Sequence, residues 1–499
     1  MSLSSAALIA QSGLNTITAQ TSVLSRNITG ANDSSIYSLK TANVISTPYG
    51  SQVASITRAT NQAVFASLLS ATSANATQTA LSSGLETLNQ TIGNISSSSS
   101  SASGSNSTSP ATLLSNFTNA LQSYEASPSN ASLASAAVSA ASTLAQGLNT
   151  AASTINQVRE QADAGIATSV QSINSLLAQF QSVNTQIIQG TASGADVTDA
   201  QDTRDNILTQ LAQQIGITTV TNANGGMSIY TDSGVTLFQG GLPRTVTFTP
   251  TSTYTASVTG NAVYIDGVPI IGPSATMPIS SGTLAGLASL RDNISVTYEA
   301  QLDGMAGGLI SAFAESPQSG SGPNLPGLFT TSGATSLPGS VTGLASQIIV
   351  NASVDPSHGG NPLLLRDGGI SGNSSYVYNT AGDASYQGRL SQLIANLSMP
   401  QTFSSSGEIG TNMTLGGYAS ASVSWLEAQR SNASSQSTYQ STLVSTATTA
   451  LSNATGVNLD NQMSQMLDLE NSYSATAKLI STIDSMFNTL LTDFQSMPL

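Results

Sequence analysis

The sequence predicts a mainly α protein with an inserted β domain. Its N- and C-terminal helices are expected to pair as a coiled coil, with a helical middle domain and a small outer β domain. Apolar residues recur at alternating intervals of four and three residues at both ends of the chain. Helical spacing returns through the middle, and it changes to strand-like alternation after Gly216. These periods distinguish helices that bury one side from strands that bury one face.

Each terminal helix is expected to carry one narrow apolar seam. Side chains spaced four and three apart lie along one side of a helix, which must pack against another helix. If the two ends pair with each other, both termini meet in one rod and the rest of the chain becomes an insertion. The alternative is that each helix packs in a bundle with its neighbours in sequence. The predicted assembly seam comprises Leu3, Ala7, Ala10, Leu14, Ile17, Leu24, Ile28, Met466, Leu469, Tyr473, Ile480, Ile483, Phe487, Leu490 and Phe494.

The middle of the chain changes character twice. Helical spacing is expected from residue 51, and Asp266-Gly267 between two short apolar runs is a strong hairpin signal. Later, Gly, Pro and Ser dominate a long segment before helical spacing returns. The predicted organisation is 1–50 N-terminal coiled-coil helix and loop, 51–215 helical domain, 216–282 β domain, 283–320 helical segment, 321–410 irregular and β region, 411–455 return of the helical domain, and 456–499 C-terminal coiled-coil helix.

The composition excludes several kinds of function. Only 7% of the 499 residues are charged, against about 25% in typical soluble proteins, and the net charge is −14. A chain with two lysines, Lys40 and Lys478, lacks a basic patch for nucleic acid. It has no cysteine, which excludes disulfides and thiolate chemistry. No apolar run approaches the roughly 20 residues of a membrane span. Residues 1–12 lack the charged start and apolar run of a cleaved signal peptide.

No catalytic, metal or cofactor site is predicted. The single histidine, His358, lies in a turn-like segment without a G-x-S-x-G elbow, so an exposed loop residue is favoured over a catalytic base. Asp196, Asp199, Asp202 and Asp205 recur at three-residue intervals and suggest a cation site at first sight. They do not match a calcium loop, and they are interpreted as complementing the dipole of the helix that begins there.

Motifs at both ends of the chain resemble the flagellar axial proteins. Ser12-Gly13-Leu14-Asn15-Thr16, followed by Leu24 to Asn32, resembles their N-terminal signature. The segments from Val457 to Asp460 and from Tyr473 to Leu491 resemble the matching C-terminal signature. This pairing is specific to rod, hook and hook-associated proteins.

The middle segments narrow the resemblance to one family. Leu114 to Ala131, Ala200 to Ile215 and Ser281 to Asp292 are similar to the helical and adjoining segments of the hook-associated protein 1 family. Ordinary rod and hook proteins lack this long helical insertion. The resemblance is not extended to residues 320 to 410.

The resemblance implies a structural protein, not an enzyme, at the hook–filament junction of a bacterial flagellum. It implies a ring of identical subunits, contacts with the hook protein and with a second hook-associated junction protein, and an export chaperone at the C-terminal helix. The location implied is extracellular, in the flagellum, after export without a cleaved signal peptide. Nucleic acid and membrane are not expected partners. Because two helices that share a narrow seam are marginal alone, the termini are expected to be loose in the monomer and to order on assembly.

The sequence leaves three alternatives open. The chain could be another axial protein of the rod or hook. A secreted coiled-coil adhesin would have a similar composition, but it should show repeats and an anchor or signal. A hydrolase inserted near residues 217–400 would need a convergent pair of acids, for which Asp266, Asp292 and Asp367 are available.

Overall fold

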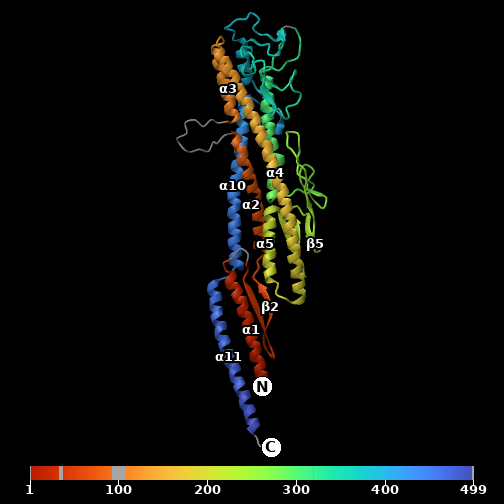
Figure 1. Cartoon of the computed structure of the whole chain (residues 1–499), viewed down its shortest axis with the longest axis vertical. Coiled ribbons are helices and arrows are strands. Elements are labelled where there is room, and N and C mark those ends of the chain that lie inside the picture. The colour runs from red at the N-terminus through yellow and green to blue at the C-terminus, as the bar shows by residue number, and fades with distance from the viewer. Residues whose placement is uncertain (1, 33–36, 93–107, 319, 497–499) are drawn as a thin grey trace.

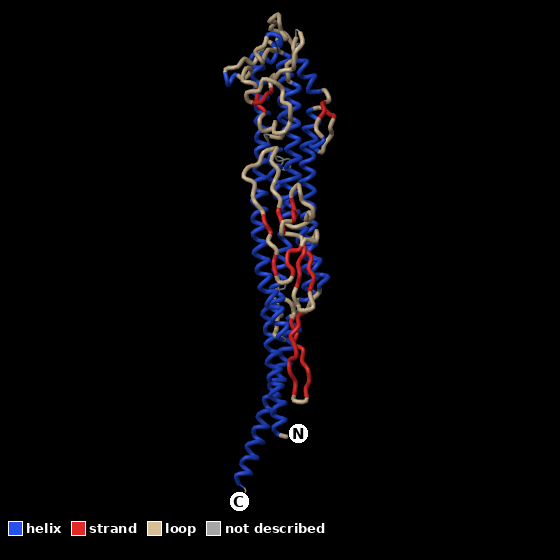
Figure 2. The backbone as a smooth tube through the Cα atoms, turned by 90° about the vertical axis from the view of Figure 1, so that its right-hand side faces the viewer, coloured by secondary structure: helices blue, strands red, loops and turns tan. Residues whose placement is uncertain are grey.

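The amphipathic ends of the chain form a rod, and the segments between them form a long helical body. The computed structural model describes residues 2–32, 37–92, 108–318 and 320–496. Figures 1 and 2 show an elongated molecule with both termini at the rod end. The predicted fold class, mainly α with paired terminal helices and a small β insertion, is confirmed.

The rod consists of two long helices and a β-hairpin. The helices lie side by side, and the hairpin packs on the N-terminal one. Helical spacing predicted from residue 51 is wrong for 51–58, because this polar stretch with β-branched residues belongs to a strand that pairs with the segment before it. The elements are α1 (Leu3–Gly30), β1 (Lys40–Thr47), β2 (Gly50–Arg58) and α11 (Leu459–Ser496).

The body is built around helices that run along the long axis of the molecule (Figure 1). The longest of them, α4, has 63 residues and reaches about 95 Å at 1.5 Å per residue. Asn130 caps its start by accepting from Ser132 and Leu133, and Gly194 ends it in the left-handed conformation. The body helices are α2 (Gln62–Asn89), α3 (Pro110–Ala126), α4 (Ala131–Ser193), α5 (Thr198–Gln214), α6 (Thr283–Ser289), α7 (Ser295–Ala312) and α10 (Leu415–Thr455), with a 3-10 turn at Gln90–Ile92 and a π-helical turn at Leu290–Ile294.

The β domain lies beside α4 in the half of the body nearer to the rod (Figure 1). It contains two small antiparallel sheets, and the hairpin predicted around Asp266-Gly267 is confirmed as β8–β9. One sheet has the order β3 (Ile217–Thr221), β4 (Met227–Thr231), β5 (Thr236–Gln239), β6 (Leu242–Pro243), and the other β7 (Val246–Thr247), β8 (Val263–Ile265), β9 (Val268–Ile271).

A largely irregular segment covers the end of the body farthest from the termini (Figure 1). It includes one helix of 11 residues, α9, whose Leu390, Leu393 and Leu397 are buried at helical spacing. The elements of this segment are β10 (Phe329–Thr331), β11 (Ile348–Val350), α8 (Leu364–Asp367), α9 (Gly388–Ser398), β12 (Gln401–Thr402) and β13 (Asn412–Met413), with 3-10 turns at Pro356–His358, Ser374–Tyr376 and Ser405–Gly407.

Two hydrophobic clusters stabilise the body. In the cluster far from the rod, the rings of Phe117, Phe313 and Phe329 contact one another with centroids 5.2 to 5.6 Å apart. In the cluster nearer to the rod, Phe180 of α4 meets Phe238 of β5 edge to face at 4.9 Å. The β domain is therefore packed onto α4 through a shared core rather than tethered to it.

Buried charges join α4, α7 and the loop that leads into β8. Nη1 of Arg159 lies 3.5 Å from Oε2 of Glu299, and the same guanidinium donates to the carbonyls of Thr255 and Val258. Burial raises the pKa of Glu299 to about 7, against the lowering effect of Arg159, and the carboxylate of Asp303 adds to the increase. Glu299 therefore titrates near neutrality in the folded protein.

This pKa predicts a loss of stability between about pH 4.5 and 7. The folded chain holds the Glu299 proton over this window while the unfolded chain, with an ordinary pKa of 4.5, releases it. The contribution to the free energy of unfolding is complete below the window and falls by on the order of 3 kcal/mol as the pH rises through it. Glu299→Gln should flatten this slope in urea titrations across the window. An identical slope in the variant would contradict the assignment.

Candidate functional site

The candidate functional site is the rod together with its joint to the body. The helices of the rod run antiparallel, because α1 leads from the N-terminus toward the body and α11 leads from the body toward the C-terminus (Figure 1). Asn27 Nδ2 donates to Gln462 Oε1 at 2.9 Å near the joint, and Gly13 faces Thr476 farther down. This register places the first turn of α1 level with residues near Met486, so the last turns of α11 extend beyond their partner helix.

The predicted seam residues are not equally buried in this arrangement. Ala10, Leu24 and Ile483 are buried. Half-buried residues are Leu3, Ala7, Leu14, Ile17, Ile28, Met466, Leu469, Ile480 and Phe487. Tyr473, Leu490 and Phe494 are exposed, Phe494 to 73%. Leu490 and Phe494 lie where α11 extends past the first turn of α1. No residue of α1 is opposite them there, so they stay exposed although they continue the repeat.

Many large hydrophobic side chains of α11 are exposed within the described chain, to between 43% and 73%. Three of them belong to the predicted seam, and most of the others lie on either side of it. This is more contiguous apolar surface than scattered single residues would give, and such surfaces mark interaction sites. The exposed residues are Leu459, Met463, Leu467, Tyr473, Leu479, Met486, Leu490, Leu491 and Phe494.

The hairpin is fixed to α1 by short polar contacts. The hydroxyls of Ser12 and Thr16 both donate to the carbonyl of Ser51, at 2.5 and 2.7 Å. Gly50 has a φ of +123°, and a Cβ there would lie 2.7 Å from Cβ of Ser12, so glycine permits this close approach. The hairpin, α1 and α11 therefore form one unit.

Asn27 is the polar centre where the parts of the rod meet. Its side-chain amide donates to the carbonyl of Lys40 at 2.8 Å, and its Oδ1 accepts from the Lys40 amide at 3.0 Å. The hydroxyl of Tyr37 also donates to Oδ1. The hydrogen bond from the Asn27 amide to Gln462 connects this point to α11. Leu39 N donates to the carbonyl of Thr455 at 2.7 Å, which ties the same point to the end of α10.

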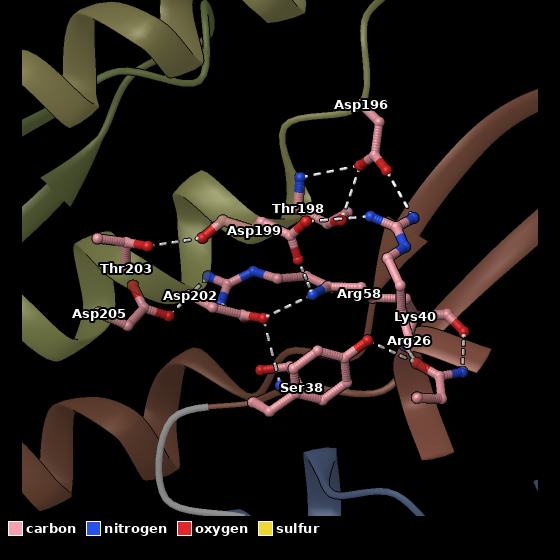
Figure 3. A network of polar contacts seen from close by, with 12 residues as sticks. Arg26, Ser38, Lys40, Arg58, Asp196, Thr198, Asp199, Asp202, Thr203 and Asp205 are labelled. Atoms are coloured by element: carbon pink, nitrogen blue, oxygen red, sulfur yellow. Dashed lines mark hydrogen bonds and ion pairs between the residues drawn. The ribbon is translucent and has the colours of Figure 1, made fainter. Parts of the chain in front are cut away.

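A network of ion pairs joins the rod to the body (Figure 3). On the rod side it contains Arg26, Lys40 and Arg58; on the body side it contains the four aspartates at the start of α5. Arg26 pairs with Asp196 at 2.8 Å and Asp199 at 3.1 Å, and Lys40 pairs with Asp199 and, at 3.2 Å, Asp202. Arg58 pairs with Asp202 at 2.9 Å and Asp205 at 2.6 Å.

The spacing of the aspartates explains how they reach the rod. Residues three apart lie on neighbouring turns of one helix face, so α5 presents Asp199, Asp202 and Asp205 to the same side. Asp196 precedes the helix and accepts from the amide and hydroxyl of Thr198 at 3.0 and 2.7 Å. The dipole interpretation was incomplete, because these carboxylates also neutralise three cations that come from the first 58 residues.

The joint is built to be stable at neutral pH. Burial opposes the charge of Lys40, but its hydrogen bond to Asp199 and the charge of Asp202 outweigh this and raise its pKa above 10.5. Burial also opposes the charge of Asp196, but the bonds from Thr198 and Arg26 lower its pKa below 3.8. The Lys40 contribution is present below its ordinary pKa and is lost as the pH rises through the raised value. The Asp196 contribution is present above its ordinary pKa and is lost as the pH falls through the lowered value.

The other predicted candidates do not assemble into a site. His358 is exposed, and its Nδ1 lies 2.9 Å from Asp355 in the same turn. Asp266, Asp292 and Asp367 lie in three different segments, each paired with a different arginine. Among the described residues, no group of three or more acidic or histidine side chains is arranged to hold a metal ion. None of the described helices combines the length and apolar character needed to cross a bilayer.

Sequence reasoning missed several residues that hold the rod and joint together. Asn27, Lys40, Arg58 and Thr16 are buried or nearly so, although polar side chains are rarely placed inside from a pattern alone. One signal was available in the sequence. In a chain with only 11 basic residues, three of them fall within residues 26–58, which is a local concentration of scarce charge.

Comparisons with known proteins match both the body and the rod. Residues 100–327 match the model of the flagellar hook-associated protein FlgK helical domain, and residues 450–493 match the C-terminal model of the flagellar basal body rod FlgEFG proteins. Flagellar hook-associated protein 1 of Escherichia coli (strain K12) is 25% identical over 186 residues, which are 37% of this chain and 34% of that protein. The alignment thus spans about a third of the relative's length.

A solved structure of the flagellar hook junction protein FlgK from Burkholderia pseudomallei is similar over 53% of this chain and 46% of that chain. It has 21% sequence identity and a TM-score of 0.41. The sequence matches fall on two separate parts of the chain. One model covers much of the helical body and the β domain, and the other covers most of α11. Over its helical body the chain is similar to the flagellar hook-associated protein FlgK family, and over α11 it is similar to the flagellar basal body rod proteins.

Proposed function

We propose that this protein is a structural subunit of the bacterial flagellum that forms the hook–filament junction and self-assembles through its paired terminal helices. The observation that carries the proposal is the rod. Helix α11 packs on α1, yet many of its large hydrophobic side chains stay exposed within the described chain. A helix whose apolar surface is only partly covered by its partner helix is suited to packing against further copies.

The partners follow from the same surface. A ring of identical copies would cover the exposed hydrophobic side chains of α11, and the predicted assembly seam from Leu3 to Phe494 would line the inner layer of the ring. The hook protein and a second hook-associated junction protein would lie on the two faces of the ring. Export without a cleaved signal would leave these hydrophobic side chains exposed in the cytosol, so a chaperone is expected to cover α11 before export.

A strain that lacks this chain provides the test. It is expected to build hooks and to release its filament protein into the medium, seen by electron microscopy of the cell surface and immunoblotting of the supernatant. A null strain with normally attached filaments would overturn the proposal. The match of residues 450–493 to rod proteins supports a second candidate, an axial rod or hook subunit. A null strain without hooks would favour that candidate.

Removal of the C-terminal helix separates assembly from folding of the body. Deletion of residues 460–499 should leave the melting transition of the body in place, because α2 to α10 supply both hydrophobic clusters. It should abolish chaperone binding and junction assembly. Unchanged swimming in the deletion strain would contradict the role given to α11.

A further inference from the structure

The β1–β2 hairpin exposes large side chains near its turn. The hairpin is held on α1, where the carbonyl of Ser51 accepts from the hydroxyls of Ser12 and Thr16. Nevertheless Ile45 is 45% exposed, and Tyr49 in the turn is 76% exposed. The hairpin therefore holds an aromatic ring and an aliphatic side chain in a fixed place, where the described chain leaves both largely uncovered.

The exposed face of the hairpin carries no charge. Residues 41–57 include no Asp, Glu, Lys or Arg. The polar side chains of this face bond to one another, since Nδ2 of Asn43 donates to the hydroxyls of Ser55 and Thr57 at 3.1 and 3.0 Å. A partner can cover such a surface without desolvating an ion. The hairpin is therefore suited to burial in an interface.

The rod places this hairpin and α11 on different sides of α1 (Figure 1). A closed ring of identical copies needs two different surfaces on each copy, so that the first surface of one copy meets the second surface of the next. Both the hairpin and α11 leave apolar side chains exposed, and α1 separates them within one copy. They are thus a pair of surfaces that a ring can bring together.

The two surfaces also lie at the same height along the rod. In a ring whose axis follows the rod, neighbouring copies meet through parts that are level with each other. Gly13 of α1 faces Thr476 of α11. The hairpin turn is level with Ser12, because a Cβ at Gly50 would lie 2.7 Å from Cβ of Ser12. The turn is therefore level with the part of α11 around Thr476, where Leu479 is 52% exposed.

Charge favours the hairpin over a second α11 as the surface that covers α11. The helix contains five acidic residues and a single lysine, Lys478. Two copies of α11 packed on each other would bring like charges together, which costs free energy when solvent is excluded between them. The uncharged hairpin adds no repulsion of this kind.

We infer that the ring is joined by contacts in which the β1–β2 hairpin of one copy packs on α11 of the next, with Tyr49 beside Leu479. This inference rests on the proposed function, because it requires a ring of copies. It goes further by naming the two different surfaces that meet and the height on the rod at which they meet.

Engineered disulfides in assembled flagella test this contact, since the chain has no cysteine of its own. One strain carries Tyr49→Cys and Leu479→Cys together, and matched strains carry each change alone. Because α1 separates the two positions within a copy, oxidation with diamide can join them only between copies. The paired variant should give a ladder of dimers, trimers and larger products, since every copy has one neighbour at each surface. Each single variant should stay monomeric.

Tyr49→Cys combined with Ser481→Cys is the control. Ser481 is exposed and lies two residues beyond Leu479, about 200° around the helix. This pair should give no ladder. A ladder from the control pair as strong as that from the test pair would overturn the inference. Dimers from Leu479→Cys alone, which would show α11 packed on α11, or no crosslinked product in assembled flagella would also overturn it.

A charge at the hairpin turn gives a second readout. Tyr49→Lys should leave the melting of the monomer unchanged, because the side chain is exposed there. It should nevertheless prevent filament attachment, since it places an ammonium group against Leu479 and near Lys478 of the next copy. Adding Leu479→Glu should restore attachment. Normal attachment with Tyr49→Lys alone, or no restoration in the double variant, would contradict the contact.

The null strain separates this inference from the proposed function. If that strain retains hooks and sheds filament protein while the disulfide results fail, the contact is wrong and the proposed function stands. A null strain with normal filaments removes the proposed function itself.

Discussion

Replacing Ile483 with Asp is expected to abolish junction assembly while leaving the body folded. Ile483 is 3% exposed, and it is the one apolar residue of α11 that is fully buried within the described chain. A carboxylate at this position must be desolvated without a partner or must force α11 away from α1, at a cost of about 4 kcal/mol. The expected result is a non-swimming strain whose subunit, purified as a monomer, retains the melting transition of the body.

Thr482→Asp is the matched control for this prediction. It adds the same charge to the adjacent position of the same helix, where the side chain is exposed. This variant should assemble and swim. If both variants assemble equally well, the α1–α11 seam does not govern assembly. If both fail, charge on α11 matters more than burial.

The second large effect is expected at the joint between rod and body. Asp202 is buried, and its carboxylate accepts from Arg58 at 2.9 Å and lies 3.2 Å from Nζ of Lys40. Asp202→Asn keeps the shape of the side chain but removes the negative charge that Lys40 and Arg58 share. This change should lower the free energy of unfolding by about 3–5 kcal/mol. Amide exchange should accelerate in β1 and β2, while α4 and α7 keep their protection.

Asp199→Asn provides the comparison at the same joint. Asp199 also pairs with two cations, but its side chain is 65% exposed, so solvent screens the interaction. Its loss should cost about 1 kcal/mol or less. Equal acceleration of exchange in β1 and β2 for the two variants would contradict the view that the buried carboxylate holds the joint.

Periodicity predicted the helices because each long helix buries a stripe that the sequence displays. Leu24 and Ile483 were found by spacing alone, and the hairpin at β8–β9 by its Asp266-Gly267 turn. The first hairpin was missed because β1 and β2 bury little on either side. Their pairing depends on α1, through Ser12 and Thr16, and not on a pattern within the strands.

The ion network at the joint lay beyond sequence reasoning for a different reason. The aspartates of α5 were seen to share a spacing, but their partners Arg26, Lys40 and Arg58 are more than 140 residues away along the chain. Nothing local distinguishes a carboxylate that complements a helix dipole from one that binds a distant cation. Likewise, the repeat in the sequence does not show that α11 extends beyond the end of α1, which leaves Leu490 and Phe494 exposed.

The central claim is that the α1–α11 rod is an assembly element, completed by neighbouring copies rather than by its own fold. Amide exchange, measured on the purified monomer and on assembled flagella, tests this most directly. We expect weak protection of residues 3–28 and 462–494 in the monomer and strong protection after assembly, with α4 protected in both. Strong protection of both terminal helices in the monomer would contradict it.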